Sequence, residues 1–493
     1  EMRGGDAYAS PRLSDAYSDI LKSTSWNQYN HNFNATLLQE TAFNSNSAGA
    51  FECWSSHYDR IRRENEFLRD AAEFGRKFGE DWLKIRIAEV RFCRAYAYFM
   101  LCRVYGGVIL RTEVDGPEQN DKARSTEEEC WGFIINELKE LAPDLPLKWD
   151  SDNSGRATQK AAYGLLSRVA LYAEKWDVAA QAARDCATAE GNLDLSKNGY
   201  AKIFELGINS PEVLFAVEFK SSVIDHAYDA YVRPSGDTKE LGKQVYSGFV
   251  PTSELVDSYE MAGDGGNFSW EKHGKDPYAN REPRFYATIL YNGADWMGRK
   301  IESFVGGKDG YKAYENAGAA GTTVTGYYLR KYLIDGDKTW VTSGSGQDWI
   351  VLRYAEVLLN KAEALAMENW NKNSAEALQA LNDVRARVGL PARATADKET
   401  FLEYVRHERK VELAGEGFRY WDLRRWRLAE KVIDGQNVHG VKISKQSDGS
   451  FTYEQVDADG GHKRIFYDRY YRFAIPLSER SNNSLCTNND GWI

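Results

Sequence analysis

Residues 402–426, LEYVRHERKVELAGEGFRYWDLRRW, say more about the fold than any other stretch of this chain. Glu408 and Glu412 stand four residues apart, so they share one face if the segment is a helix. Gly415 and Gly417 are expected to end that helix. A second short helical segment should follow, because charged residues there alternate with large aromatic ones.

The charges in this run allow two interpretations. One is a catalytic pair of carboxylates, and the other is an ion-pair network that fastens two helices together. We favour the network, because the run holds enough arginines to neutralise its acids, and charges packed among aromatic rings must be paired. We therefore expect Glu408, Glu412, Arg419, Asp422 and Arg425 to be buried and paired with one another.

The same run resembles the signature of the SusD/RagB family, E-R-x-x-E-L-x-x-E-G-x-R-x-x-D-L-R-R-W, which it matches from Glu408 to Trp426 without departure. Other segments similar to the family occur in the family's order over nearly the whole chain. They are WSSHYDRIRREN (54–65), AEVRFCRAYAYFMLCRVYGGV (88–108), RATQKAAYGLLSRVALYAEKWDVAA (156–180), DWIVLRYAEVLLNKAEAL (348–365), ALNDVRARVGLP (380–391) and YRFAIPLSERSNNSLCTNNDGW (471–492).

The resemblance implies a glycan-binding lipoprotein on the extracellular face of a Gram-negative outer membrane. Such a protein captures oligosaccharide without turning it over and delivers it to a SusC-like TonB-dependent transporter. Its lipid anchor would be attached upstream of Glu1. The first residues, EMRGGD, are not a signal peptide, so the chain looks like a trimmed mature form. The RagB branch of the family would make peptide the cargo instead.

Composition excludes several other classes of protein. The net charge of −10 and the pI of about 5.5 argue against a nucleic-acid binder. No apolar run approaches the roughly 18 residues of a membrane span. The sequence has no phosphate-binding loop, no HExxH motif and no GxSxG motif, and its seven histidines show no ligand spacing. We expect no catalytic residue, no metal and no cofactor.

Apolar residues at helical spacing predict a mostly α scaffold of helix pairs, similar to an unevenly spaced array of tetratricopeptide repeats. Capping boxes are expected at Ser125 with Glu128 and at Asn373 with Glu376. The helix from Trp54 is expected to pair with residues 17–21. The predicted helices cover residues 54–67, 82–105, 125–143, 158–173, 176–183, 350–366 and 374–388.

Residues 191–345 are predicted to be a loop-rich insert, because they are rich in glycine. Alternating apolar residues at 213–219 predict a strand within it. We expect the insert to pack on helical parts at 1–190 and 346–493, so that the chain forms one integrated body.

Loops on a rigid scaffold commonly carry binding residues, and several aromatic residues of the insert adjoin turn-forming residues. An aromatic ring can stack on the apolar face of a sugar, while short amides and carboxylates bind its hydroxyl groups. The predicted stacking residues are Trp270, Tyr278, Tyr291, Trp296 and Tyr311. Asn44 and Asn46, in a polar loop at 41–48, are predicted to contact hydroxyl groups.

Two alternatives to glycan capture stay open at this stage. A glycoside hydrolase would need a pair of carboxylates, for which Asp264, Asp276 and Asp295 are weak candidates. A helical-repeat adaptor would bind proteins or peptides, and peptide would be the cargo in the RagB branch of the family. A turnover assay separates the first alternative from glycan capture, and a comparison of glycan with peptide binding separates the second.

Overall fold

A computed structural model describes residues 11–24, 43–116, 121–188, 199–263, 265–314 and 322–492. Helices make up 49% of it and strands 11%, so the prediction of a mostly α chain is confirmed. The named strands occur in two-stranded sheets.

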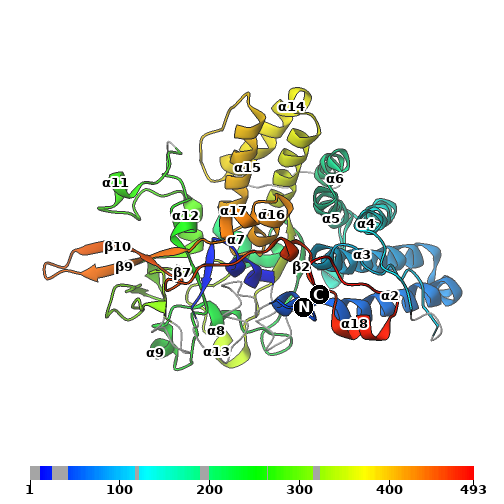
Figure 1. The fold of residues 1–493 in the computed structure, drawn as a ribbon, viewed down its shortest axis with the longest axis horizontal. Coiled ribbons are helices and arrows are strands. Elements are labelled where there is room, and N and C mark those ends of the chain that lie inside the picture. Colours follow the sequence, from blue (N-terminus) through cyan, green and yellow to red (C-terminus); the bar gives the residue numbers. More distant parts are fainter. Residues whose placement is uncertain are drawn as a thin grey trace.

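The long helices form a continuous series in which each packs against the next (Figure 1). Helix α6 precedes the loop-rich region and α14 follows it, and the two lie against each other. Helices from both sides of that region therefore share one core. The series is α2 (Trp54–Phe74), α3 (Glu80–Tyr105), α4 (Glu127–Leu141), α5 (Gln159–Tyr172), α6 (Trp176–Thr188), α14 (Tyr354–Arg387) and α15 (Lys398–Glu412).

The partner of α2 differs from the prediction. Helix α2 packs against α3, whereas the segment expected to pair with it lies elsewhere. That segment consists of a short 3-10 helix, η2 (Pro11–Tyr17), which packs on α16 (Arg419–Arg425), and of strand β1 (Leu21–Ser23). Strand β1 pairs in antiparallel register with β3 (Phe249–Pro251).

Neither capping box forms at the residues predicted for it. At α4 the cap is Thr126, whose hydroxyl accepts from the Glu129 backbone N–H at 3.2 Å while the Glu129 carboxylate accepts from the Thr126 N–H at 2.8 Å. The sequence STEEE offers this box in two registers. Ser125 is excluded because its own N–H donates to the carbonyl of Val108 at 2.9 Å, in the preceding extended segment.

The span labelled α14 contains two helices, as predicted at 350–366 and 374–388, and they join at Asn369, whose φ of −164° and ψ of 94° are not helical. The side chain of Asn369 accepts from the backbone N–H of Lys372 at 3.2 Å, so the second helix begins earlier than predicted. Asn373 is buried and donates to the carbonyl of Leu365 at 3.4 Å, so it does not cap that helix. The residues before α14 form strand β8 (Trp349–Arg353), because this apolar run pairs with β2 (Val213–Val217), the strand predicted near 213–219.

Short elements and loops fill the rest of the fold. A longer hairpin, β9 (His439–Lys445) with β10 (Phe451–Asp457), extends at the left of Figure 1. The remaining named helices are α7 (Gly199–Leu206), α8 (Tyr228–Val232), α9 (Asp237–Leu241), α10 (Ser253–Val256), α11 (Trp270–His273), α12 (Pro283–Thr288), α13 (Trp340–Ser343), α17 (Ala429–Ile433) and α18 (Leu477–Asn482). The remaining strand pairs are β4 (Ile289–Leu290) with β7 (Tyr328–Leu329), and β5 (Asp295–Trp296) with β6 (Arg299–Lys300).

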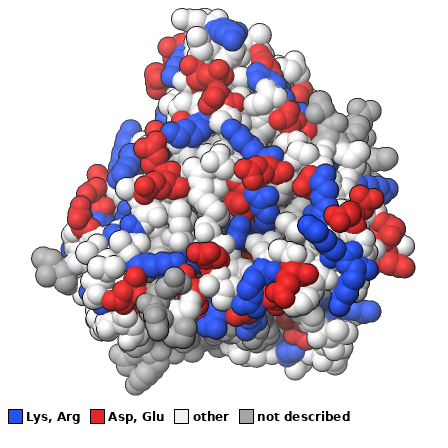
Figure 2. All heavy atoms as spheres, turned by 90° about the vertical axis from the view of Figure 1, so that its right-hand side faces the viewer, with Lys and Arg blue, Asp and Glu red and all other residues white. Residues whose placement is uncertain are grey.

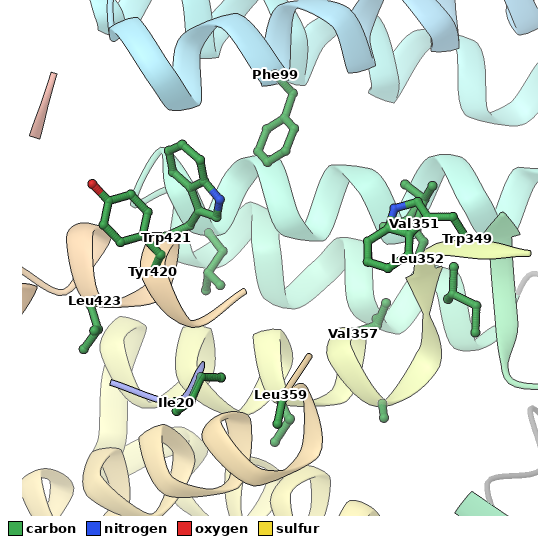
Figure 3. Packing of buried hydrophobic residues seen from close by; sticks show 14 of the residues in the cluster. Ile20, Phe99, Trp349, Val351, Leu352, Val357, Leu359, Tyr420, Trp421 and Leu423 are labelled. Carbon is green, nitrogen blue, oxygen red and sulfur yellow. The ribbon is translucent and has the colours of Figure 1, made fainter. Parts of the chain in front are cut away.

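One apolar core joins these parts (Figure 3). It includes Ile20 from the N-terminal segment, Phe99 from α3, Leu359 from α14 and Trp421 from α16, all of which are buried. Burial of aromatic and branched side chains from four distant segments makes the helices depend on one another for stability.

The five charged residues predicted to be buried in the 402–426 run are largely buried, but Glu408 and Glu412 pair with arginines outside the run. Glu408 pairs with Arg284 at 2.6 Å and with Arg385 at 3.0 Å. Glu412 pairs with Arg284 at 2.9 Å and with Arg353 at 2.6 Å. The run therefore ties α15 to the loop region, to β8 and to the end of α14, which sequence spacing alone did not indicate.

Asp422 is the residue that pairs within the run, as predicted. Its carboxylate accepts from Arg409 and from Arg425, each at 2.8 Å. Arg425 also binds Glu363 of α14, whereas Arg419 binds Asp19 of the N-terminal segment at 2.8 Å. The favourable charge of Arg409 and Arg425 overcomes the effect of burial, so the pKa of Asp422 lies below its usual value.

Candidate carbohydrate-binding site

Three of the five predicted aromatic residues lie together, alongside a ring from hairpin β9–β10. The ring centroid of Tyr278 is 4.6 Å from that of Tyr291 and 5.9 Å from that of Tyr453. The centroid of Trp270 is also 5.9 Å from that of Tyr453. We call Trp270, Tyr278, Tyr291 and Tyr453 the aromatic cluster.

The cluster is assembled from segments that are distant in sequence. Trp270 begins α11, Tyr278 lies in the turn before α12, and Tyr291 follows β4. Tyr453 belongs to β10, where it pairs with Ile443 of β9. Elements α11, α12 and β10 lie on the same side of the molecule (Figure 1).

Hydrogen bonds hold two parts of the cluster in place. The hydroxyl of Tyr286 donates to the carbonyl of Tyr278 at 2.8 Å and accepts from the backbone N–H of Arg281 at 3.1 Å. The indole N–H of Trp270 donates to the carboxylate of Asp257 at 2.9 Å. Burial raises the pKa of Asp257 to about 6, although the bond from Trp270 acts in the opposite direction.

The rings of the cluster differ in exposure. Trp270, Tyr291 and Tyr453 are half-buried and therefore keep part of their surface open to solvent. Tyr278 is only 6% exposed, because Tyr291 and Phe285 lie beside its ring. The expectation that Tyr278 is held outward is wrong, and its ring forms a layer beneath the open ones.

Polar groups border the open rings. Burial raises the pKa of Tyr453, and the nearby carboxylate of Asp276 raises it further. Burial also raises the pKa of Tyr291, and the exposed carboxylates of Asp295 and Asp276 add to that effect. A carboxylate at that place offers acceptors to the hydroxyl groups of a ligand stacked on the rings.

A hollow of about 270 Å³ adjoins the cluster through Tyr286. Its lining includes Arg330, whose guanidinium donates to the carbonyl of Tyr286 at 3.4 Å and is partly exposed. The neighbourhood therefore holds apolar faces, acceptors and a donor, which suits a polyhydroxylated ligand better than an apolar one.

Trp296 does not present a face to solvent, contrary to expectation. It is fully buried, and its indole N–H donates to Asp237 at 3.0 Å. The guanidinium of Arg233 lies 5.2 Å from its ring centroid. The turn residues around Trp296 place its backbone at the surface, but the short strand β5 directs the side chain inward.

The other predicted residues lie outside the cluster. Tyr311 is half-buried on a loop where the N–H of Val305 donates to the carbonyl of Ile443 in β9 at 2.8 Å. Asn44 and Asn46 are exposed, and the carbonyl of Asn46 accepts from Leu477 at the start of α18, far from α11 in Figure 1. Part of the polar loop, residues 41–42, lies outside the described residues.

Two of the candidate acids of a hydrolase lie among the described residues. Asp295 is exposed and binds Lys300 at 2.7 Å across the β5–β6 turn. Burial raises the pKa of Tyr291, and the charges of Asp295 and Asp276 both raise it further. Asp264 lies outside the described residues.

Sequence reasoning missed Tyr453 and Tyr286, and it named Asp276 only as a candidate acid of a hydrolase. Tyr453 lies beyond the insert, in a segment that reads FTYEQV, where alternation of apolar and polar residues indicated a strand. That alternation would have marked Tyr453 as a side chain on one face of a hairpin. The proximity of the hairpin to α11 had no signal in the sequence.

The described residues show no sign of a metal site or of a membrane-spanning helix. They contain no group of three or more His, Cys, Asp or Glu side chains that could hold a metal ion. None of their helices is long and apolar enough to cross a membrane. Acidic and basic side chains are interspersed on the face formed by the right-hand side of Figure 1, as Figure 2 shows, so that face has no basic footprint for nucleic acid.

Comparison with known protein families shows which family the chain belongs to. Residues 211–492 match the SusD family, and residues 4–171 match a family described as starch-binding and associating with the outer membrane. The chain belongs to the SusD family. The family suggested by the 402–426 run is thereby confirmed. Proteins of this family bind glycans without catalysis, and the chain is accordingly a non-catalytic binding protein.

Relatives with known sequences or structures agree with this assignment. A SusD-like protein of Bacteroides ovatus is 26% identical over 452 residues, which cover 86% of this chain and 74% of the relative. The crystal structure of a SusD-like protein from Bacteroides fragilis superposes with a TM-score of 0.84 at 27% identity, covering 98% of this chain and 93% of the other. A surface glycan-binding protein of Bacteroides thetaiotaomicron, solved with laminarihexaose, shares the fold with a TM-score of 0.70 at 19% identity, covering 97% and 93%.

Proposed function

We propose that the chain is a cell-surface oligosaccharide-binding lipoprotein that uses the aromatic cluster to capture glycan. The observation that carries this proposal is the group of half-buried rings at Trp270, Tyr453 and Tyr291, supported from beneath by Tyr278. Each open ring offers an apolar face to the C–H side of a pyranose.

The polar groups would set the orientation of the sugar. Asp276 would accept hydrogen bonds from hydroxyl groups above Tyr453 and Tyr291, while Arg330 would donate from the adjoining hollow. Such sites derive most of their affinity from apolar burial, and their few polar groups provide specificity.

Binding should be tested on the purified chain with an array of neutral and acidic oligosaccharides that includes laminarihexaose. We expect saturable binding of at least one glycan class and no release of reducing sugar from it. A parallel set of peptides tests the RagB-type alternative. Binding of peptide without glycan would contradict the proposal, and release of reducing sugar would contradict the non-catalytic assignment.

The proposal extends to a membrane anchor and a partner. Family membership supports attachment to the outer membrane by an N-terminal lipid, and transfer of the captured glycan to a SusC-like TonB-dependent transporter. Affinity purification of the lipidated protein from outer membranes of its own bacterium should recover such a transporter in stoichiometric amount. Recovery of the protein without any transporter would contradict this part of the proposal.

A further inference from the structure

A second hollow, of about 230 Å³, lies on the helical scaffold and is lined by side chains that the aromatic cluster does not use. It forms where the α5–α6 turn meets α14, α15 and the end of α16. In Figure 1 these helices lie away from α11 and the β9–β10 hairpin. The hollow is smaller than a typical drug-sized pocket, so its occupant is a small molecule or a single unit of a larger one.

Aromatic side chains form part of its wall. Trp426 is fixed, because its indole N–H donates to Glu363 at 2.8 Å and the guanidinium of Arg425 lies 4.7 Å from its ring centroid. Trp176 and Tyr172 are half-buried beside it. Within the described part of the chain, the indole N–H of Trp176 has no hydrogen-bond acceptor, so Trp176 can offer both its ring and a donor.

Two opposite charges stand at the rim. The guanidinium of Arg427 lies 4.1 Å from the ring centroid of Tyr471, is 62% exposed, and has the carboxylate of Asp468 at 3.8 Å, so its N–H groups stay largely open to solvent. Glu174 is exposed and forms no ion pair with any other described residue. Arg406 also lines the hollow: its Nη1 donates to Glu403 at 2.5 Å, whereas its Nε is buried without a hydrogen-bond partner among the described residues.

The backbone at this rim turns at two helix ends. Glu174 follows α5 and Arg427 follows α16, and each adopts a φ of 55° in the left-handed region. The backbone N–H of Lys175 donates to the carbonyl of Ala170 at 2.9 Å, and that of Leu428 donates to the carbonyl of Leu423 at 2.8 Å, which closes each helix end. The two helix ends place a carboxylate and a guanidinium at the edge of the same hollow.

We infer that this hollow is a second carbohydrate subsite that holds one neutral pyranose unit. Trp176 supplies an apolar face, Glu174 accepts from hydroxyl groups, and Arg427 and Arg406 donate to hydroxyl or ring oxygens. The unpaired acid and the loosely paired base balance each other, which favours a neutral sugar over a charged one. The inference rests on the proposed glycan-binding function, and two sites on one chain would bind a polysaccharide more tightly than either site alone.

The test uses the full chain labelled with 5-fluorotryptophan and observed by fluorine NMR. Trp176→Phe and Trp270→Phe assign the two resonances that report on the two sites. The titrants are methyl glycosides of glucose, galactose and mannose, with methyl glucuronide as the charged comparison. We expect at least one neutral glycoside to shift the Trp176 resonance saturably. Glu174→Gln and Arg427→Gln should each weaken that response about tenfold.

Matched controls separate this inference from the proposed function. Asp152→Asn, which removes an exposed carboxylate outside the hollow, should leave the Trp176 response unchanged. A shift of the Trp270 resonance without any shift at Trp176 would overturn the second subsite and leave the proposed function standing. A response at Trp176 to glucuronide alone would overturn the neutral assignment. If no glycoside shifts either tryptophan resonance and no glycan on the array binds, both the second subsite and the proposed function are contradicted.

Discussion

At the scale of single residues, arginines from outside the family signature hold the fold together. Arg353 alone binds Glu212 at 2.8 Å, Glu412 at 2.6 Å and Glu416 at 2.7 Å, all in the buried interior. Because a guanidinium has five donors in a fixed plane, it can join three acids that a lysine could not. The signature acids are therefore better understood as anchors for distant segments than as a self-contained network.

Replacing Asp422 tests the structural role of this network. Asp422→Ala removes a buried negative charge that pairs with Arg409 and Arg425, so the free energy of unfolding should fall by about 3–5 kcal/mol. Chemical denaturation measures the change. Glu128→Ala, which removes an exposed partner of Lys175, should cost less than about 1 kcal/mol. Equal stability of the Asp422 variant and the wild type would show that the pairing is dispensable.

Glu64, in α2, gives a pH-dependent prediction. Burial raises its pKa from 4.5 to about 7, against the favourable charges of Arg94 and Arg60. The folded state thus prefers the protonated form, and the stability this group contributes is lost as the pH rises from about 4.5 to 7. Glu64→Gln has no such loss, so it should be more stable than the wild type at pH 8 and similar at pH 4. A stability difference independent of pH would contradict this assignment.

At the scale of elements, the sequence predicted the scaffold helices well because each carries a long apolar stripe. It failed where two local signals competed. The STEEE segment offers two capping registers, and the tertiary contact of Ser125 with Val108 selects the second. Likewise, residues 349–353 suit a buried helix as well as a strand, and pairing with β2 selects the strand.

Caps provide a matched pair of variants for α4. Thr126→Ala removes the side chain that accepts from the Glu129 N–H and should cost about 0.5–2 kcal/mol of stability. Ser125→Ala, one residue earlier, should cost much less because its hydroxyl does not cap the helix. Melting temperatures of the two variants give the comparison. The reverse order of stability would place the cap at Ser125.

At the scale of the whole molecule, the N-terminal segment and the loop region are built into the scaffold. Asp15 accepts from the backbone N–H groups of Gly415, Gly417 and Arg419, and Lys22 binds Asp459 at 2.9 Å with both side chains buried. These contacts span about 400 residues of sequence. Sequence patterns report neighbours along the chain, so they could not have indicated them.

The shared core leads to an expectation about unfolding. Helices α6 and α14 pack together across the loop region, so loss of either side exposes apolar surface on the other. Calorimetry should therefore record a single cooperative transition. Two separate transitions, one for each side of residues 191–345, would contradict the description of one core.

The candidate site shows the same limit of sequence reasoning. Glycine-rich loops predicted where exposed aromatic rings would lie, and Trp270 and Tyr291 are half-buried there, with part of each ring open to solvent. The direction of each ring depends on local backbone geometry, and therefore Trp296 and Tyr278 were expected at the surface but are buried. Tyr453 joins the cluster only through the packing of the hairpin.

The central claim is that the aromatic cluster captures glycan, and isothermal titration of one double variant tests it most directly. Trp270→Ala combined with Tyr453→Ala removes two open rings, each worth about 1–3 kcal/mol by analogy with base stacking. Phe74→Ala combined with Phe78→Ala, which removes two rings that are 56% and 58% exposed on the scaffold, is the matched control. We predict at least a tenfold loss of affinity for the best array glycan in the first variant, which should remain folded at the assay temperature by circular dichroism, and wild-type affinity in the control. Wild-type affinity in the folded cluster variant would contradict the claim.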